Sequence, residues 1–293
     1  MKSTCSFCGR QSLKSNKSIR PIEWNGTRRF WYCSNCEGYT LLPRLIDSEM
    51  TDLYSNYYND DSPDEGTNSL DVKFSELIAY LKSEKEIVRV LDYGCGVDGF
   101  LPSQSADLGM QIDGFEISSK TIDILKNKFP EQQFYDPVSF DYSDTTYDLV
   151  VLSDVLEHLS FPSELLQSIK RKLKTDGCIW IQQPLENNRT LFTLAIKTWV
   201  LVTRSHSSII PPYHVSLASK HSMLKLIESS GFEVVRYKIS ETMWPAQWNQ
   251  AFRSPRQFLL TSIKCLDFLI SFSLRDYGTR ISLLIKKKED LKN

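Results

Sequence analysis

The segment over residues 90–99 constrains the fold more than any other part of the chain. It begins as an apolar strand that ends at Asp92 and continues into a turn with glycine at positions 94, 96 and 99. Glycines at such a turn let the backbone approach a ligand closely. A strand, a glycine turn and a helix in this order are typical of an α/β protein that binds its ligand at the carboxyl ends of its strands.

The chain beyond residue 74 alternates between strand and helix patterns. Apolar runs predict strands over residues 87–91, 112–115, 133–135, 148–152, 178–181, 232–237 and 281–285. Helical spacing predicts helices over residues 74–81, 118–129, 165–173 and 223–231. Ser118 is a candidate N-cap, and Asp176-Gly177 a candidate turn. These repeated units predict a mostly parallel, doubly wound sheet with helices on both faces.

Composition and charge are those of an ordinary globular protein. Of 293 residues, 41% are hydrophobic and 24% are charged, and the formal net charge is −1, so a generally basic nucleic-acid binder is not indicated. The chain starts without an apolar run. Its most apolar stretch, residues 191–203, contains Lys197 and is shorter than the ~20 residues of a membrane span, so it predicts a buried or lid helix. We therefore expect a cytoplasmic protein without a transmembrane segment.

Four of the seven cysteines form two pairs with the spacing of a metal site. Cys5-x2-Cys8 and Cys33-x2-Cys36 are separated by 24 residues, and four thiolates suit one tetrahedral Zn²⁺. A closed set of four ligands leaves no open position, so we predict a structural zinc. The alternative is a set of free thiols in a small core. The aromatic and basic residues between the pairs would form either one face of a small β-ribbon or a surface for nucleic acid.

The first part of the chain has a basic segment followed by an acidic segment. Residues 1–45 carry eight basic and two acidic side chains, whereas residues 46–71 carry eight acidic side chains and no basic one. Turn-forming residues fill positions 59–66, as in a linker or loop. We predict three parts: a zinc-ribbon-like module over 1–45, an acidic linker and helix over 46–85, and the main domain over 86–293.

Acidic residues around the glycine turn discriminate between two cofactor classes. A dinucleotide would place its diphosphate at the helix N-terminus, where Asp92 and Asp98 would repel it. S-adenosylmethionine carries a sulfonium and an ammonium group and no phosphate, so Asp92 suits it. Glu116 ends the next strand and can accept hydrogen bonds from both hydroxyls of a ribose. The alternative for Asp92 alone is helix capping.

Four segments resemble the ordered motifs of class I S-adenosylmethionine-dependent methyltransferases. They lie over residues 91–96, 114–118, 147–159 and 173–179, and the resemblance covers about residues 86–290. It implies a Rossmann-like, seven-stranded doubly wound sheet with a reversed last strand. The segment Lys174-Thr175-Asp176-Gly177 stands where the family usually has Lys-Pro-Gly-Gly, a departure that lies away from the cofactor.

The same resemblance implies a cofactor site at the ends of several strands. Its residues would contact the amino-acid moiety (Asp92, Gly94, Gly96), the ribose (Glu116), the adenine (Ile117, Asp136) and the methionine end (Ser153, Asp154). Asp154, Glu157 and His158 are also similar to a segment of ubiquinone-biosynthesis O-methyltransferases, in which such carboxylates and histidine take part in metal binding. Because the same segment is common across the wider class without metal, both alternatives stay open.

The segment Pro211-Pro212-Tyr213-His214 predicts a loop that faces the acceptor. A histidine can take a proton from a hydroxyl group near pH 7, so His214 is the candidate base and Tyr213 a positioning residue. A structural histidine bonded to a backbone carbonyl is the alternative. We expect residues 190–215 and 240–260, which follow two predicted strands, to form the acceptor pocket.

Together these features predict an enzyme that transfers a methyl group from S-adenosylmethionine. A four-cysteine module joined to this domain is similar to bacterial methyltransferases of sugar and glycan biosynthesis, which implies a small-molecule acceptor such as a sugar or glycan precursor. One alternative is an RNA-modifying methyltransferase, which the basic module would support. Another is a non-catalytic module that binds the cofactor. The sequence indicates neither the methylated atom nor the oligomeric state.

Overall fold

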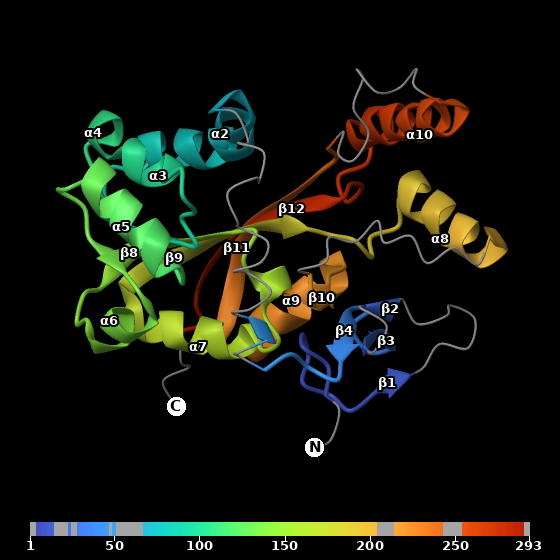
Figure 1. The fold of residues 1–293 in the computed structure, drawn as a ribbon, viewed down its shortest axis with the longest axis horizontal. Helices are drawn as coiled ribbons and strands as arrows, with labels where there is room; N and C mark the ends of the chain where they lie inside the picture. Colours follow the sequence, from blue (N-terminus) through green and yellow to red (C-terminus); the bar gives the residue numbers. More distant parts are fainter. Residues whose placement is uncertain are drawn as a thin grey trace. The chain divides into compact units, whose positions relative to one another are not determined.

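The computed structural model describes residues 4–14, 23–24, 28–46, 49–50, 67–203, 214–242 and 254–289 (Figure 1). The chain divides into two compact units. Unit 1 comprises Met1–Leu45, Leu156–Glu164 and Gln182–Leu283. Unit 2 comprises Ile46–Val155, Leu165–Ile181 and Leu284–Asn293.

A seven-stranded mixed sheet has the strand order β11-β12-β9-β8-β5-β6-β7. Its strands are β5 (Arg89–Tyr93), β6 (Gln111–Phe115), β7 (Phe134–Tyr135), β8 (Tyr147–Ser153), β9 (Leu173–Pro184), β11 (Phe232–Ser240) and β12 (Arg280–Lys287). β5 pairs in parallel with both β6 and β8, and β6 pairs in parallel with β7. The last strand, β12, lies between β11 and β9. The prediction of a seven-stranded sheet is thereby confirmed.

β9 begins earlier than the sequence predicts. It includes Asp176 and Gly177, so the turn predicted there is wrong. A Cβ at position 177 would lie 2.9 Å from the backbone oxygen of Tyr147, which is why only glycine lets β9 pass so close to β8. Strand packing here overrides the local turn propensity of an Asp-Gly pair.

The core of unit 2 explains why its central strands are almost purely apolar. Val90 and Leu91 of β5 are fully buried, as are the four residues 149–152 of β8, because helices of a parallel sheet cover both faces. The unit 2 core includes Phe74, Leu77 and Leu81 of α2 (Thr67–Ser83). The other helices that follow in this part of the chain are α3 (Phe100–Ser103), α4 (Ser105–Leu108), α5 (Ser119–Lys128), α6 (Pro137–Tyr142) and α7 (Pro162–Lys172).

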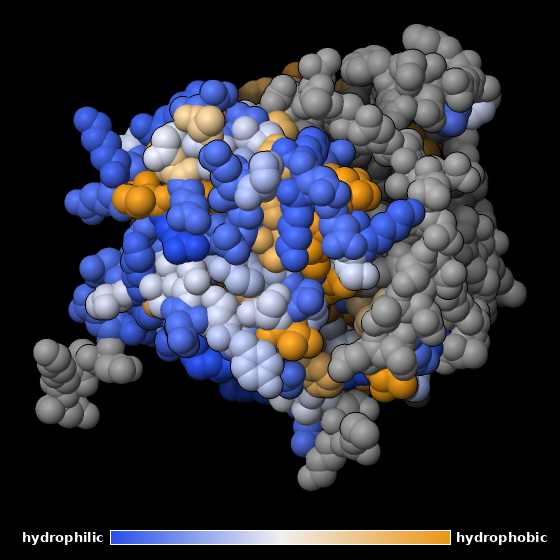
Figure 2. Space-filling view, turned by 60° about the vertical axis from the view of Figure 1, so that its left-hand side comes forward, coloured by the Kyte–Doolittle hydropathy of each residue, from blue (hydrophilic) through white to orange (hydrophobic). Residues whose placement is uncertain are grey.

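The surface agrees with this division between core and solvent. Figure 2 shows mostly hydrophilic side chains on the face in view, with apolar residues scattered among them, as is usual for a surface in water.

The first residue of helix α5 is set by a capping residue in the sequence. The hydroxyl of Ser118 accepts a hydrogen bond from the Thr121 N–H at 3.2 Å, which confirms Ser118 as an N-cap.

A second, antiparallel sheet lies in unit 1. Its strands are β1 (Leu13–Lys14), β2 (Glu23–Trp24), β3 (Arg28–Cys33), β4 (Tyr39–Leu42) and β10 (Ser216–Leu217). β10 comes from a distant part of the chain and pairs with β4, with Ser216 opposite Thr40 and Leu217 opposite Tyr39. The N-terminal module therefore shares its sheet with a strand that the sequence did not predict.

The remaining helical elements of unit 1 are η1 (Leu156–His158), α8 (Leu191–Thr203), α9 (Lys220–Ser229) and α10 (Pro255–Ser271). α8 confirms the helix predicted over the most apolar stretch. α10 was not predicted, although Ser254 and Pro255 are N-cap and first-turn signals. Among the residues that the structure describes, no helix combines the length and apolarity needed to cross a membrane.

Candidate functional site

The glycine turn of unit 2 follows β5 and has a backbone that only glycine adopts without steric cost. Gly94 has a φ of +84° and Gly96 a φ of +63°. The Gly94 N–H donates to the carbonyl of Phe115 at 2.8 Å, which ties the turn to the end of β6. A Cβ at position 96 would meet no atom within 4 Å. The backbone at Gly96 therefore borders open space on the side of its missing Cβ.

Glu116 follows β6 and contacts the same turn. Its carboxylate accepts hydrogen bonds from the Gly96 N–H at 3.2 Å and from the Ile117 N–H at 2.7 Å. The side chain of Ile117 is 48% exposed. The structure thus brings together Gly96 and Glu116, which the sequence analysis assigned to one cofactor site.

Asp92 ends the apolar part of β5 and is buried. Burial raises the pKa of its carboxyl group to about 7; Lys73 opposes this shift and the charge of Glu116 adds to it. A buried carboxyl group with a pKa near neutrality gains its charge readily when a cation binds beside it.

Lys73 of α2 was missed by the sequence analysis. Its Nζ lies 2.9 Å from Oδ2 of Asp154, which directly follows β8 and has a φ of +55°, a rare conformation for a residue other than glycine. The neighbouring Ser153 has a buried hydroxyl group without a hydrogen-bond partner in the described part of the chain. A lysine on an amphipathic helix is an ordinary surface pattern, so no sequence signal could have singled out Lys73.

Asp136 has a structural role in the fold. Its carboxylate accepts the Ser139 N–H at 2.7 Å, and the Ser139 hydroxyl accepts the Asp136 N–H at 2.9 Å, which forms a capping box at the start of α6. Hydrogen bonding to Ser139 lowers the pKa of Asp136. The predicted contact of Asp136 with adenine stays a prediction beside this role.

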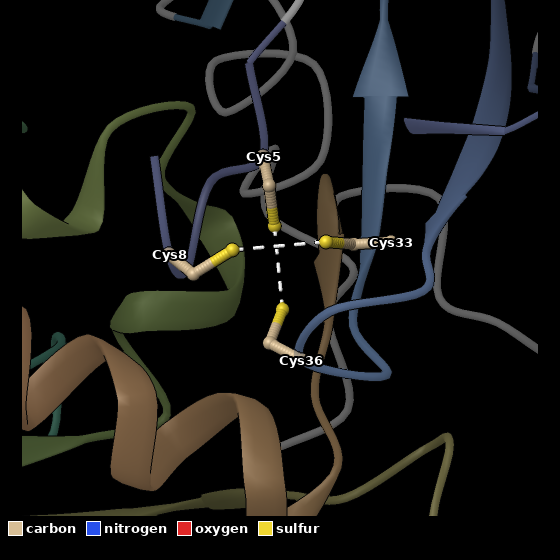
Figure 3. Close-up of side chains that lie close together, drawn as sticks. All are labelled: Cys5, Cys8, Cys33 and Cys36. Atoms are coloured by element: carbon tan, nitrogen blue, oxygen red, sulfur yellow. Dashed lines mark hydrogen bonds between the residues drawn. The ribbon is translucent and has the colours of Figure 1, made fainter. Parts of the chain in front are cut away.

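The four cysteines of the N-terminal module point their sulfur atoms toward one another in unit 1 (Figure 3). The Sγ atoms of Cys5 and Cys36 are 3.5 Å apart, and those of Cys8 and Cys33 are 3.6 Å apart. All four sulfur atoms lie within 4.8 Å of one another. Donation from the Cys36 thiol lowers the pKa of Cys5. The structure therefore brings together the complete ligand set that the sequence predicts for one metal ion.

A second cluster of unit 1 surrounds His214. The Nδ1 atom of His214 lies 2.5 Å from Oε1 of Glu186, a residue that the sequence analysis did not consider. The ring of His158 meets the His214 ring edge-on, with centroids 5.0 Å apart and an interplanar angle of 75°. Tyr213 lies outside the described residues, as do most of residues 240–260.

The group of possible metal ligands in the structure differs from the set Asp154, Glu157 and His158 that the sequence suggests. Ligand atoms of Glu157, His158 and His214 lie within 4.8 Å of one another, whereas Asp154 forms its ion pair with Lys73 in unit 2. The three residues over 156–158 also form a short 3-10 helix. Whether this group binds a metal ion stays a hypothesis.

The family of the chain follows from a comparison with known protein families. The methyltransferase domain family matches residues 64–237, which is more than half of the chain. The chain belongs to the methyltransferase domain family. The matched residues include the glycine turn, Glu116 and β8, so the class I S-adenosylmethionine-dependent methyltransferase domain predicted from the sequence motifs is confirmed.

Individual relatives and solved structures are similar to parts of this chain. The ubiquinone biosynthesis O-methyltransferase of Paracidovorax citrulli is 27% identical over 161 residues, which is 50% of this methyltransferase and 66% of that relative. The match thus spans slightly less than two thirds of the relative's length. The PH0226 protein of Pyrococcus horikoshii shares the fold, with a TM-score of 0.50 at 14% identity over 80% of this chain and 99% of that one. A SAM dependent methyltransferase from Archaeoglobus fulgidus has a TM-score of 0.48 at 23% identity, over 75% and 93%.

Proposed function

We propose that this methyltransferase transfers a methyl group from S-adenosylmethionine to a hydroxyl group of a small-molecule acceptor. The observation that carries the proposal is the pair of acids, Asp92 and Glu116, that borders the glycine turn beside the open space at Gly96. Asp92 suits the cationic part of the donor, and Glu116 suits the hydroxyl groups of its ribose. Two acids at the same turn would repel the diphosphate of a dinucleotide.

The other donor contacts are assigned by the family motifs. The backbone of Gly94 and Gly96 would hold the amino-acid moiety together with Asp92, and the exposed side chain of Ile117 supports its role as a platform for adenine. Asp136 would meet the adenine amino group. Ser153 and Asp154 would line the methionine end, and the buried Ser153 hydroxyl is a group that a ligand can satisfy.

The reaction requires that the protein place the donor and the acceptor beside each other and remove the proton of the acceptor hydroxyl group. When bound, S-adenosylmethionine supplies a methyl group already activated by its sulfonium. His214 would accept the proton of the acceptor hydroxyl at Nε2 while the new C–O bond forms and the C–S bond breaks. Tyr213 would position the acceptor.

The relatives support the choice of a small hydroxylated acceptor. The relative of Paracidovorax citrulli is named for O-methylation in ubiquinone biosynthesis, which supports an oxygen atom as the site of methyl transfer. The sugar or glycan precursor implied by the four-cysteine module stays a prediction, and the relatives support neither it nor an RNA acceptor. A non-catalytic module would bind the donor and produce no S-adenosylhomocysteine with a panel of small phenols and monosaccharides.

The affinity for S-adenosylmethionine should rise with pH between 6 and 8. Because the pKa of Asp92 without ligand is about 7, its carboxyl group is protonated at lower pH, whereas a cationic ligand favours the carboxylate. At about one pH unit below this pKa, displacement of the proton should weaken binding about tenfold. Titration calorimetry at both pH values, in buffers of different ionisation enthalpy, measures the affinity and the released proton.

Two variants test the same site. Asp92→Asn should bind the donor more weakly and lose the pH dependence, because no carboxyl group titrates. Glu116→Ala should weaken binding roughly ten- to a hundredfold at both pH values, since it removes charge-assisted hydrogen bonds worth ~1.5–3 kcal/mol each. Unchanged binding in both variants would contradict the proposed donor site, and binding of NAD in place of S-adenosylmethionine would favour a dinucleotide site.

We also infer that the four cysteines hold a structural Zn²⁺. With Zn–S bonds of about 2.3 Å, the sulfur atoms of a tetrahedral site lie about 3.8 Å apart. The sulfur atoms of Cys5 and Cys36 are 3.5 Å apart and those of Cys8 and Cys33 are 3.6 Å apart, which is close to this value. Four protein ligands complete the coordination, so the ion would stabilise the module and take no part in the chemistry.

The purified protein should therefore contain about one zinc ion per chain. Cys33→Ser should lower the zinc content and loosen the β3–β4 part of the second sheet, since metal binding supplies much of the folding free energy of such small modules. Cys178→Ser, at a half-buried cysteine outside the cluster, is the matched control and should keep its zinc. Elemental analysis measures the content; absence of zinc from protein prepared without chelator would contradict the inference.

A further inference from the structure

Glu186 occupies a fixed place just beyond the end of β9. The residue before it donates its N–H to the Thr279 carbonyl at 2.7 Å, and the residue after it donates to the Ala218 carbonyl at 2.9 Å. Two hydrogen bonds to distant parts of unit 1 therefore hold the backbone on both sides of Glu186. Its side chain is only 16% exposed, so the carboxylate has a restricted position.

The carboxylate of Glu186 is a hydrogen-bond partner of His214. Its Oε1 atom lies 2.5 Å from Nδ1 of His214, and its Oε2 atom is buried without a hydrogen-bond partner among the described residues. An ionised carboxylate only accepts hydrogen bonds. The proton of the neutral imidazole then lies on Nδ1, so that the lone pair is on Nε2.

The His214 ring is held from other sides as well. The N–H of Val215 donates to the Glu157 carbonyl at 2.8 Å, and the Val215 carbonyl accepts the Leu41 N–H at 3.0 Å. The edge of the His158 ring lies against the His214 ring. The backbone next to His214 is thus held by Glu157 and Leu41, and its ring contacts His158, while Glu186 is the hydrogen-bond partner of Nδ1.

We propose that Glu186 is the positioning residue of methyl transfer, which holds His214 in the tautomer that accepts the acceptor's proton at Nε2. This inference rests on the proposed function of His214 as the base. The hydroxyl proton passes to Nε2 as the oxygen gains the methyl group, the electron pair of the C–S bond stays on the sulfur, and His214 becomes an imidazolium. The negative charge of Glu186 stabilises that imidazolium and makes no contribution to binding of the acceptor.

Nitrogen NMR of protein with ¹⁵N-labelled histidine tests the pairing without any acceptor. The His214 signals, assigned by their loss in His214→Ala, should show a proton on Nδ1 and an unprotonated Nε2 at pH 8. Glu186→Leu, which cannot accept a hydrogen bond, should abolish this preference. A His214 with its proton on Nε2 in the unmodified protein would overturn the inference.

Kinetics then separate positioning from folding. With an acceptor found in the panel of small phenols and monosaccharides, Glu186→Gln and Glu186→Leu should lower kcat roughly ten- to a hundredfold and leave KM nearly unchanged. Glu186→Asp should keep part of the lost rate, and added formate should raise the rate of Glu186→Ala. Unchanged kcat in Glu186→Leu, while His214→Ala is inactive, would overturn the inference and leave the proposed base intact.

A metal ion is the competing use of this cluster, because Glu157, His158 and His214 bring their ligand atoms together. Addition of Mn²⁺ to zinc-loaded protein distinguishes the two. Selective broadening of the His158 and His214 signals, together with a rise in turnover, would show that His214 is a ligand and would overturn the inference. Sharp signals and unchanged turnover support the pairing of Glu186 with His214.

Discussion

His214→Ala should lower kcat by about a hundredfold or more, with little change in the affinity for S-adenosylmethionine. The expected loss is the usual worth of a positioned general base. The imidazole is buried and held by Glu186, so its loss removes a proton acceptor that water cannot replace in the same place. Turnover is measured as S-adenosylhomocysteine formed with the identified acceptor, and donor affinity by calorimetry.

His221→Ala is the matched control for this experiment. His221 lies on α9 of the same unit, is exposed, and contacts only the carbonyl of Asn35 among its hydrogen-bond partners in the described structure. Its removal should leave kcat within about twofold of the unmodified protein, as expected for a surface substitution. Full activity of His214→Ala on the true acceptor would reduce His214 to a structural residue.

Lys264→Met should lower the free energy of unfolding by about 3–5 kcal/mol. Lys264 lies on α10 and forms an ion pair with Glu241, and the side chains of both are at most 1% exposed. Removal of one member of a buried pair leaves the other charge without compensation, which is the costly case. Thr279 donates to the same oxygen of Glu241 at 2.7 Å, but a hydroxyl group cannot balance the charge. Urea denaturation followed by circular dichroism measures the change.

Two further variants define the origin of that loss. Lys264→Met combined with Glu241→Gln should recover at least half of it, because no uncompensated charge remains. Lys225→Met is the exposed control: its pair with Glu228 lies at the surface of α9, and its loss should cost less than about 1 kcal/mol. A change below about 1 kcal/mol in Lys264→Met would show that the buried pair does not stabilise the fold.

The central sheet and the grouping of Asp92, Gly96 and Glu116 at one edge of it were within reach of the sequence. Runs such as residues 149–152 are apolar at every position because β8 is buried on both faces. Asp92 lies near the end of β5, the glycine turn follows β5 and Glu116 follows β6, and parallel strands bring their carboxyl ends to the same edge. Local pattern and tertiary arrangement agree in this region, so the prediction needed no long-range information.

Unit 1 was harder to predict, because its contacts join residues from distant segments. Lys264 and Asp267 interrupt the apolar spacing of α10, yet both are buried, with Glu241 as one partner and Tyr277 as the other. Glu186 follows a strand and belongs to no recognisable sequence motif. Its contact with His214 is seen only in the folded structure. β10 has two residues, too few for any periodicity. Its pairing with β4 cannot be seen in the sequence.

The pairing of β4 with β10 has a practical consequence for work on this enzyme. The N-terminal module looks in the sequence like an appendage that a shortened version could omit. In the structure, its strand β4 lies along the two residues that follow Val215, and the N–H of Leu41 holds the Val215 carbonyl. Truncation before residue 46, chelation of the proposed zinc ion or oxidation of the thiols would each disturb β4, which pairs with the residues next to His214. A preparation damaged in this way would still retain the donor with normal affinity and would be mistaken for an enzyme tested with the wrong acceptor.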